Sequence, residues 1–104
     1  MKFTVYQINL SDKDYENSVL REMYLNTTMD PTTEAIQKAA GLYAKVAEID
    51  ALSFDHVFEI GNIGPEEKIT RFDDMHSVSV GDIIKSESGV MKFVAPYGFK
   101  SIAF

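Results

Sequence analysis

The residues of this chain best suited to chemistry lie between positions 73 and 82. The run SVSVGDII begins at Ser77, directly after His76, and carries Asp82 at its turn. Serine, histidine and aspartate make up a hydrolytic triad, so a nucleophilic Ser77 is the first hypothesis. Neighbouring side chains on a strand point to opposite faces, however, which places His76 badly as a base for Ser77. We therefore predict that this run is the joint between two strands.

A metal site is the second hypothesis for the same region. Asp73, Asp74 and His76 lie within four residues, and His56 could join them from a nearby strand. Imidazole and carboxylate together form a ligand set used for zinc and iron. The spacing matches no tight metal-binding motif, and a histidine beside acidic residues is typical of a solvated loop. The main prediction therefore includes no catalytic residue, metal or cofactor, and a metal-dependent enzyme is kept as an alternative.

The third hypothesis concerns the C-terminal residues, where aromatic side chains alternate with lysines. The set is Phe93, Tyr97, Phe99 and Phe104 with Lys92 and Lys100. Aromatic rings can stack on bases and lysines can contact phosphates, so a small nucleic-acid-binding module is a second alternative. The same alternation is required of any strand that covers a core, so we expect these aromatic rings to pack beneath the strands.

The composition predicts one folded domain, residues 1–104. The chain has 104 residues, of which 45% are hydrophobic, and this is enough apolar material for one core. It has no cysteine, which excludes disulfides, thiolate metal sites and a cysteine nucleophile. The N-terminus shows no signal-like apolar run, and no stretch of about 18 apolar residues occurs. We expect a cytoplasmic protein with no membrane span.

Negative charge is concentrated in residues 48–82. This segment holds nine acidic and two basic residues, a balance of -7, whereas the whole chain carries -6. An acidic balance repels phosphate backbones, so we expect no nonspecific binding to nucleic acid. A loop rich in glycine and proline would display the central acids of the segment to a protein partner. The predicted partner-binding residues are Glu66, Glu67, Asp73, Asp74 and His76.

The first part of the chain predicts two strands and two helices. Residues 2–10 alternate between apolar and polar and suit a strand. Ser11 followed by Asp14 resembles an N-cap with an acidic first turn, so a helix is expected from there to about residue 26. A second helix is predicted from Asp30 and Pro31 through Tyr43 to Ala47, because apolar residues recur at helical spacing; Gly41 marks a close contact or an end within it. Residues 54–60 are predicted as a strand.

Turn residues divide the rest of the chain. The predicted structural turn positions are Gly61, Gly64, Gly81, Asp82 and Gly98. Between them, Val78 and Val80 share one face of a predicted strand, and runs at 83–85, 90–95 and 99–104 suit an antiparallel meander. The predicted fold is α+β: a mostly antiparallel sheet of about four or five strands, with the two helices packed on one face.

A family resemblance adds to this interpretation. The run RFDDMHSVSVGDII at 71–84, followed by VAPYGFKSI at 94–102, is similar to the C-terminal region of small proteins of tailed phages and bacterial mobile elements, in the domain called YodL-like. The segment from 58 to 84, with the start YQINLSD, looks especially like hypothetical proteins of T4-like marine phages. The resemblance covers residues 58–104 well and the N-terminal strand weakly.

The resemblance implies an origin more than an activity. The family has no established catalytic residues, so none are carried over to this chain. It implies a cytoplasmic accessory protein, made during infection, that modifies host or defence machinery. With the acidic segment, it leads to our main prediction, a nonenzymatic protein that binds a host, defence or phage protein through its acidic surface.

Overall fold

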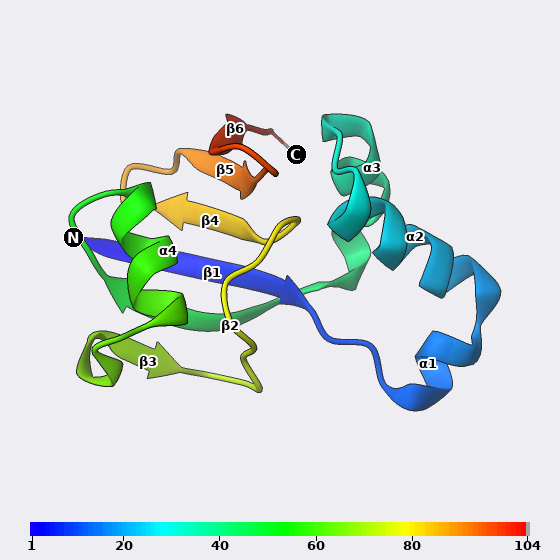
Figure 1. Cartoon of the computed structure of the whole chain (residues 1–104), viewed down its shortest axis with the longest axis horizontal. Helices are drawn as coiled ribbons and strands as arrows, with labels where there is room; N and C mark the ends of the chain where they lie inside the picture. The colour runs from blue at the N-terminus through cyan, green and yellow to red at the C-terminus, as the bar shows by residue number, and fades with distance from the viewer. Residues whose placement is uncertain (104) are drawn as a thin grey trace.

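The computed structural model describes residues 1–103 and has a six-stranded antiparallel sheet at its centre (Figure 1). In their order across the sheet the strands are β3 (Ile69–Arg71), β2 (Tyr43–Asp50), β1 (Lys2–Ile8), β4 (Ile83–Ser86), β5 (Met91–Val94) and β6 (Phe99–Ser101). Every neighbouring pair is antiparallel. The α+β class is confirmed, with six strands instead of four or five, and the last three strands form the predicted meander.

The helices lie in two places. They are α1 (Asp12–Glu16), α2 (Ser18–Met29), α3 (Thr33–Lys38) and α4 (Phe54–Asn62), with short 3-10 turns at Ala40–Leu42 and Glu66–Lys68. The first three form an arm at one end of the sheet, whereas α4 lies across one of its faces (Figure 1). The prediction of two helices on one face therefore missed two helices and the separate arm. No helix within residues 1–103 is long and apolar enough to cross a membrane.

Alternate residues of the central strands enter two hydrophobic clusters. Ile84 of β4 packs in a buried cluster with Val57 of α4, while its neighbour Ile83 packs in a second cluster with Ile36 of α3. Successive side chains of a strand point to opposite faces, so the two clusters lie on the two sides of the sheet. A central sheet buried on both sides explains why β4 is apolar at consecutive positions.

The predicted first strand and the start of the first helix are confirmed. Ser11 Oγ accepts the N–H of Asp14 at 3.1 Å, and the Asp14 carboxylate accepts the N–H of Ser11 at 3.4 Å, so the two form a capping box. This first helix is short because Asn17 interrupts it and caps α2 with its own side chain. Helix α2 then continues to Met29, three residues beyond the predicted end near residue 26.

The predicted second helix is too long. Its N-cap is Thr32, whose Oγ1 accepts a backbone N–H at 3.0 Å, and helix α3 ends at Lys38. Gly41 lies in the 3-10 turn that follows, so it marks an end of the helical segment. The remaining residues belong to β2, where Ala47 pairs with Val5 of β1. A short apolar run fits one face of a helix or of a strand, and here the pairing with β1 decides for the strand.

The segment at 54–60, predicted as a strand, is helix α4. Ser53 caps it by accepting the N–H of His56 at 3.2 Å, and its residues Val57 and Ile60 enter the core three positions apart. Gly61 consequently lies inside a helix and not in a left-handed turn. A Cβ at Gly61 would come within 2.3 Å of the Val78 side chain, so glycine is needed there for close packing.

Three of the predicted turn glycines have the expected left-handed backbone. The φ angles are +106° at Gly64, +94° at Gly81 and +77° at Gly98. The predicted strand through Val78 and Val80 is wrong, since these residues form an irregular connection that pairs with no strand. The run SVSVGDII nevertheless does join two strands, because it leads from the β3 side of the sheet into β4.

Candidate functional site

The segment between β3 and β4 carries the sequence-predicted chemistry and crosses the sheet. Strand β3 is at one edge, and β2 and β1 separate it from β4. The connection at 72–82 must therefore pass over both strands, and it does so on the face that carries α4 (Figure 1). The crossing brings His76 to the C-terminal end of β1, beside the helical arm.

A buried glutamine of β1 holds this crossing segment in place. Gln7 donates from Nε2 to the backbone oxygen of His76 and to Asp82 Oδ2, both at 2.9 Å. Its Oε1 accepts the backbone N–H of His76 at 3.1 Å. Two residues further along the chain, Asn9 donates from its side chain to the backbone oxygen of Asp74. Each hydrogen-bonding group of the Gln7 amide is thus used to fix one loop.

Asp82 acts as the turn residue that the sequence predicted. Its Oδ2 accepts the backbone N–H of Ser79 at 2.8 Å as well as the Gln7 amide. The residue is only 5% exposed. Loss of water around the carboxylate raises the pKa of Asp82 to about 6, although the Ser79 N–H, the nearby His76 and the Gln7 amide each favour the ionised form. Asp82 is therefore an acid whose charge is only partly compensated.

The turn before Asp82 packs against the end of helix α2. A Cβ on Gly81 would lie 2.2 Å from the backbone oxygen of Thr27, so only glycine allows this approach. The hydroxyl of Tyr43 in β2 donates to the Gly81 oxygen in a short hydrogen bond. Burial first, and then the negative charge of Asp82, raise the pKa of Tyr43, while the nearby Thr27 side chain opposes the shift. Helix α2, strand β2 and, through Gln7, strand β1 therefore meet at one turn.

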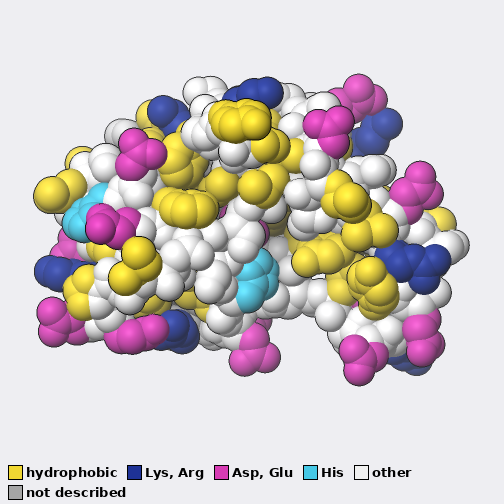
Figure 2. Space-filling view, in the orientation of Figure 1, with side chains coloured by type: hydrophobic (Ala, Val, Ile, Leu, Met, Phe, Trp, Pro, Cys, Tyr) yellow, Lys and Arg dark blue, Asp and Glu magenta, His cyan; other side chains and the backbone are white. Residues whose placement is uncertain are grey.

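A pocket of about 110 Å³ lies where these elements meet. The polar or aromatic residues that line it are Tyr24, Thr27, Thr28, Tyr43, His76, Ser79 and Asp82. A larger hollow of about 440 Å³ shares Ile8, Tyr24 and His76 with the pocket. Figure 2 shows an indentation between the sheet and the arm, with a histidine side chain at its edge. The pocket and the hollow together form what we call the arm groove.

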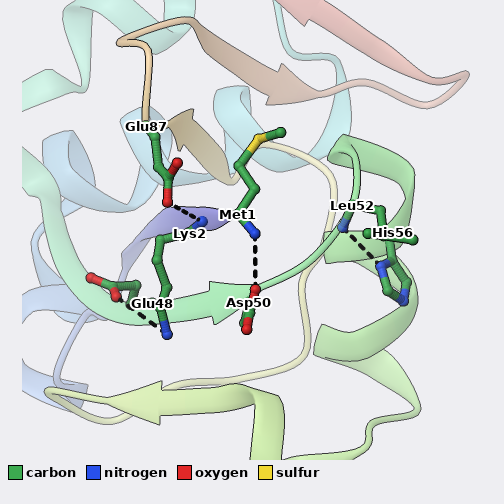
Figure 3. Close-up of polar contacts among 7 residues, drawn as sticks. All are labelled: Met1, Lys2, Glu48, Asp50, Leu52, His56 and Glu87. Carbon is green, nitrogen blue, oxygen red and sulfur yellow. Dashed lines mark hydrogen bonds and ion pairs between the residues drawn. The ribbon is translucent and has the colours of Figure 1, made fainter.

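The four residues of the metal hypothesis do not form a site. His56 lies on α4, and its Nδ1 accepts the N–H of Leu52 at 3.0 Å (Figure 3). His76 uses its Nδ1 on the backbone oxygen of Ser77 at 2.8 Å. In the part of the chain that the structure describes, no three histidine, aspartate or glutamate side chains are grouped so that they could hold a metal ion.

The acidic partner-binding residues are exposed around β3. Glu66 forms a two-point ion pair with Arg71, which lowers the pKa of Glu66 and raises that of Arg71. Asp73 accepts the N–H of Asp74 at 2.8 Å. Glu67 is exposed and makes no side-chain hydrogen bond with residues 1–103. Three of the four carboxylates therefore have no basic partner in this part of the chain.

His76 lies between two parts of the predicted surface. It lines one hollow of about 170 Å³ with Glu66 and Arg71. It also lines the arm groove together with Asp74. The structure thus brings His76 near Glu66 on one side and near Asp74 on the other, whereas Glu67 lines neither hollow.

The aromatic residues of the nucleic-acid hypothesis are mostly used for packing. Phe93 is completely buried, and the ring of Phe99 packs against Phe54 with 5.9 Å between the centroids. The Nζ of Lys92 lies 4.7 Å from the centre of the Phe54 ring. The expectation that these rings pack beneath the strands is confirmed for Phe93.

Little remains in this region for stacking bases. Tyr97 is 95% exposed between β5 and β6, and Lys100 is exposed on β6. Phe104 lies outside the described residues. One exposed ring is less than the several stacking rings that a single-strand-binding surface uses.

Two residues of the site were missed from the sequence. Gln7 is the first polar residue after Phe3 and Val5 on the buried side of β1, and this break in the apolar pattern was a usable signal. Tyr43 was predicted to lie on the apolar face of a helix, and nothing in the neighbouring sequence indicated that it lies beside Asp82. Asp82 was predicted only as a turn residue, and its burial depends on contacts from β1 and α2.

Comparison with protein-family models, with curated proteins and with solved structures finds no match. The site is therefore described by two features of its own geometry: an exposed acidic surface around β3 and a polar arm groove with a buried carboxylate.

Proposed function

We propose that this chain is a nonenzymatic accessory protein that binds a basic surface of another protein. The binding surface, which we call the acidic surface, is formed by Glu66, Glu67, Asp73 and Asp74, with His76 beside it. The observation that carries the proposal is that all four carboxylates are exposed, two in the turn before the edge strand β3 and two in the segment that follows it, while Arg71 is the one basic residue of 1–103 paired with any of them. Such a surface attracts a positively charged partner and sets its orientation.

Exposed apolar side chains next to these acids support an interface. Ile63 is 85% exposed after α4, and Phe72 is 52% exposed after β3. Protein interfaces combine apolar anchors with a polar or charged rim. The ring of Phe72 already has one cation near it, Lys45 Nζ at 4.9 Å from its centre. A partner with basic and apolar side chains therefore fits this surface better than a nucleic acid does.

The choice of partner follows from the family resemblance. The likeness of residues 58–104 to YodL-like proteins of tailed phages and mobile elements covers the acidic surface and the whole crossing segment. A phage accessory protein acts in the cytoplasm of its bacterial host, so we propose a host or defence protein as the partner.

Affinity capture from a bacterial host lysate tests this proposal. The test variant carries Glu66→Lys, Glu67→Lys, Asp73→Lys and Asp74→Lys. The matched control carries Asp12→Lys, Glu16→Lys, Glu22→Lys and Asp30→Lys, four exposed residues of the arm that make no side-chain hydrogen bond or ion pair within residues 1–103. Both variants change the net charge equally, so nonspecific electrostatic retention changes equally in both.

We expect a specific host protein to be retained by the native chain and by the arm control, and to be lost from the acidic-surface variant. Mass spectrometry identifies the retained protein. Retention by all three proteins, or loss from both variants alike, would contradict binding through the acidic surface.

A further inference from the structure

Asp82 is a buried carboxylate without a cationic partner from residues 1–103. The ion pairs of the described residues are Met1 with Asp50, Lys2 with Glu48, Lys38 with Glu34, and Arg71 with Glu66. None involves Asp82, and neither the pocket nor the larger hollow is lined by lysine or arginine. A buried charge is costly unless a counter-charge compensates it. The arm groove therefore presents a negative charge that has His76 near it but no lysine or arginine of residues 1–103.

The free oxygen of Asp82 is open to the pocket. Its Oδ2 takes both hydrogen bonds, from Gln7 and from Ser79, and its Oδ1 takes none within residues 1–103. No enclosed side-chain oxygen or nitrogen of the described residues lacks a hydrogen bond. Since Oδ1 has no partner, it must be accessible, and the pocket that Asp82 lines provides this access.

Four of the hydroxyl groups around the pocket present acceptors. Thr27 and Thr28 donate their protons to backbone oxygens of the preceding turn of α2. Tyr43 donates to the Gly81 oxygen and Ser79 donates to a backbone oxygen two residues earlier. A hydroxyl that has donated its single proton has only lone pairs left. The pocket therefore offers several hydroxyl acceptors, and Tyr24, whose hydroxyl makes no hydrogen bond within residues 1–103, is the lining residue with a hydroxyl still able to donate.

His76 adds a further acceptor in its neutral form. Its Nδ1 is 2.8 Å from the backbone oxygen of Ser77, and a carbonyl oxygen can only accept. Nδ1 must therefore carry the hydrogen, which leaves Nε2 of the neutral ring with a lone pair.

The end of helix α2 contributes negative potential. Thr27 and Thr28 lie in its last turn, where backbone oxygens lack helical partners and the helix dipole is negative. This last turn contains no basic residue that would neutralise the dipole. The buried carboxylate and the helix end therefore favour the same kind of ligand, a cation.

We propose that the pocket beside Asp82 binds the primary ammonium group of a lysine side chain from a polypeptide partner. An ammonium group has three donors and no acceptor, so it matches a small pocket in which a carboxylate oxygen and most of the hydroxyls present acceptors. The adjoining hollow, with Ile8, Leu10 and Tyr15 on its walls, holds the aliphatic stem of the lysine. That the partner is a protein rests on the proposed function, whereas recognition of the ammonium group rests on the pocket alone.

The binding of small probes tests the pocket without the partner. Amide chemical shifts of the ¹⁵N-labelled protein are followed by NMR during titration with N-acetyl-lysine methylamide, n-butylamine and tetramethylammonium chloride. Tetramethylammonium carries the charge but has no N–H donor. Asp82→Asn is the test variant, because its side-chain oxygen can still accept both hydrogen bonds, and Glu22→Gln is the matched control on the exposed surface of α2.

We expect saturable shifts of Gly81, Thr27 and Thr28 with the lysine derivative and with butylamine. Asp82→Asn should weaken both by at least about tenfold, because a hydrogen bond to a charged group is lost. Glu22→Gln should bind as the native protein does. Equal binding by Asp82→Asn, equal binding of tetramethylammonium, or no shifts at these residues would overturn the proposal.

The pH dependence gives a second measurement on the native protein. Because burial raises the pKa of Asp82 to about 6, the affinity for butylamine should increase about tenfold between pH 5 and pH 7.5. The other titratable groups that line the arm groove are His76, Tyr43, Tyr24, Tyr15 and Asp74. A His76→Gln variant separates the contribution of His76, and an increase that is lost in His76→Gln but kept in Asp82→Asn would contradict the role of Asp82.

The outcomes also separate the two proposals. Probe binding with no captured protein would support the pocket and contradict the acidic surface, whereas a captured protein with no probe binding would do the reverse. Tighter binding of butylamine than of a lysine-containing peptide would indicate that the pocket takes a free amine, which overturns the choice of a polypeptide.

Discussion

Replacement of Asp82 by asparagine should change how stability depends on pH. The folded chain holds the Asp82 proton more tightly than the unfolded chain, because burial raises the pKa from its ordinary value of 3.8 to about 6. Between these pH values the folded state binds more protons than the unfolded state, so the free energy of unfolding falls as pH rises. The stabilisation is fully present below 3.8 and is lost above about 6.

The size of the effect follows from the pKa change. At 1.36 kcal/mol for each pKa unit, a rise from 3.8 to about 6 corresponds to about 3 kcal/mol in total. About 1 kcal/mol of this is already lost at pH 4.5, so about 2 kcal/mol remains to be lost between pH 4.5 and pH 8. Asparagine cannot ionise and keeps the same shape, so the Asp82→Asn variant lacks this loss.

Urea denaturation of both proteins at several pH values between 4.5 and 8 measures the difference. We expect the free energy of unfolding of Asp82→Asn, relative to the native chain, to increase by about 2 kcal/mol over this range. The control Glu22→Gln, which removes an exposed carboxylate from α2, should show no comparable change in the free energy of unfolding. A constant difference between Asp82→Asn and the native chain would refute a raised pKa at Asp82.

Two further substitutions test the packing that builds the arm groove. Gly81→Ala should destabilise the fold by about 2 kcal/mol more than Gly89→Ala in thermal or urea denaturation. Both glycines have positive φ, but only the Cβ at Gly81 would meet the Thr27 oxygen. Equal losses of stability in the two variants would contradict the close approach. Gln7→Ala should cost about 2 to 4 kcal/mol, since it leaves buried groups of the crossing segment unpaired, whereas the exposed Gln37→Ala should cost less than about 1 kcal/mol; similar losses in the two variants would argue against the role of Gln7.

Some of the fold was predictable because its signals are local. Alternation identified β1, the pairing of Ser11 with Asp14 identified a helix start, and turn residues divided the three strands of the meander. The left-handed backbone at Gly81 followed from glycine chemistry. Each of these features depends on residues close together in the chain, so sequence patterns carry them.

Two assignments failed because apolar runs of moderate length fit helices and strands equally well. Residues 43–47 became a strand through pairing with β1, about 40 positions away, as in the pair Val5 and Ala47. Residues 54–60 became a helix because Ser53 caps them and because Val57 enters the core beneath α4. Neither deciding contact is visible in a local window of sequence.

The sequence by itself determined the acidic, cysteine-free composition, the α+β class, and the turn at Gly81 and Asp82. Only the tertiary structure made Asp82 a buried acid, since its partner Gln7 is 75 positions away in the chain. The arm groove likewise requires β1, β2, α2 and the crossing segment to meet. Burial and unpaired charge are properties of such long-range contacts, which is why a residue recognised from sequence as a turn aspartate becomes, in the folded protein, the centre of a candidate ammonium site.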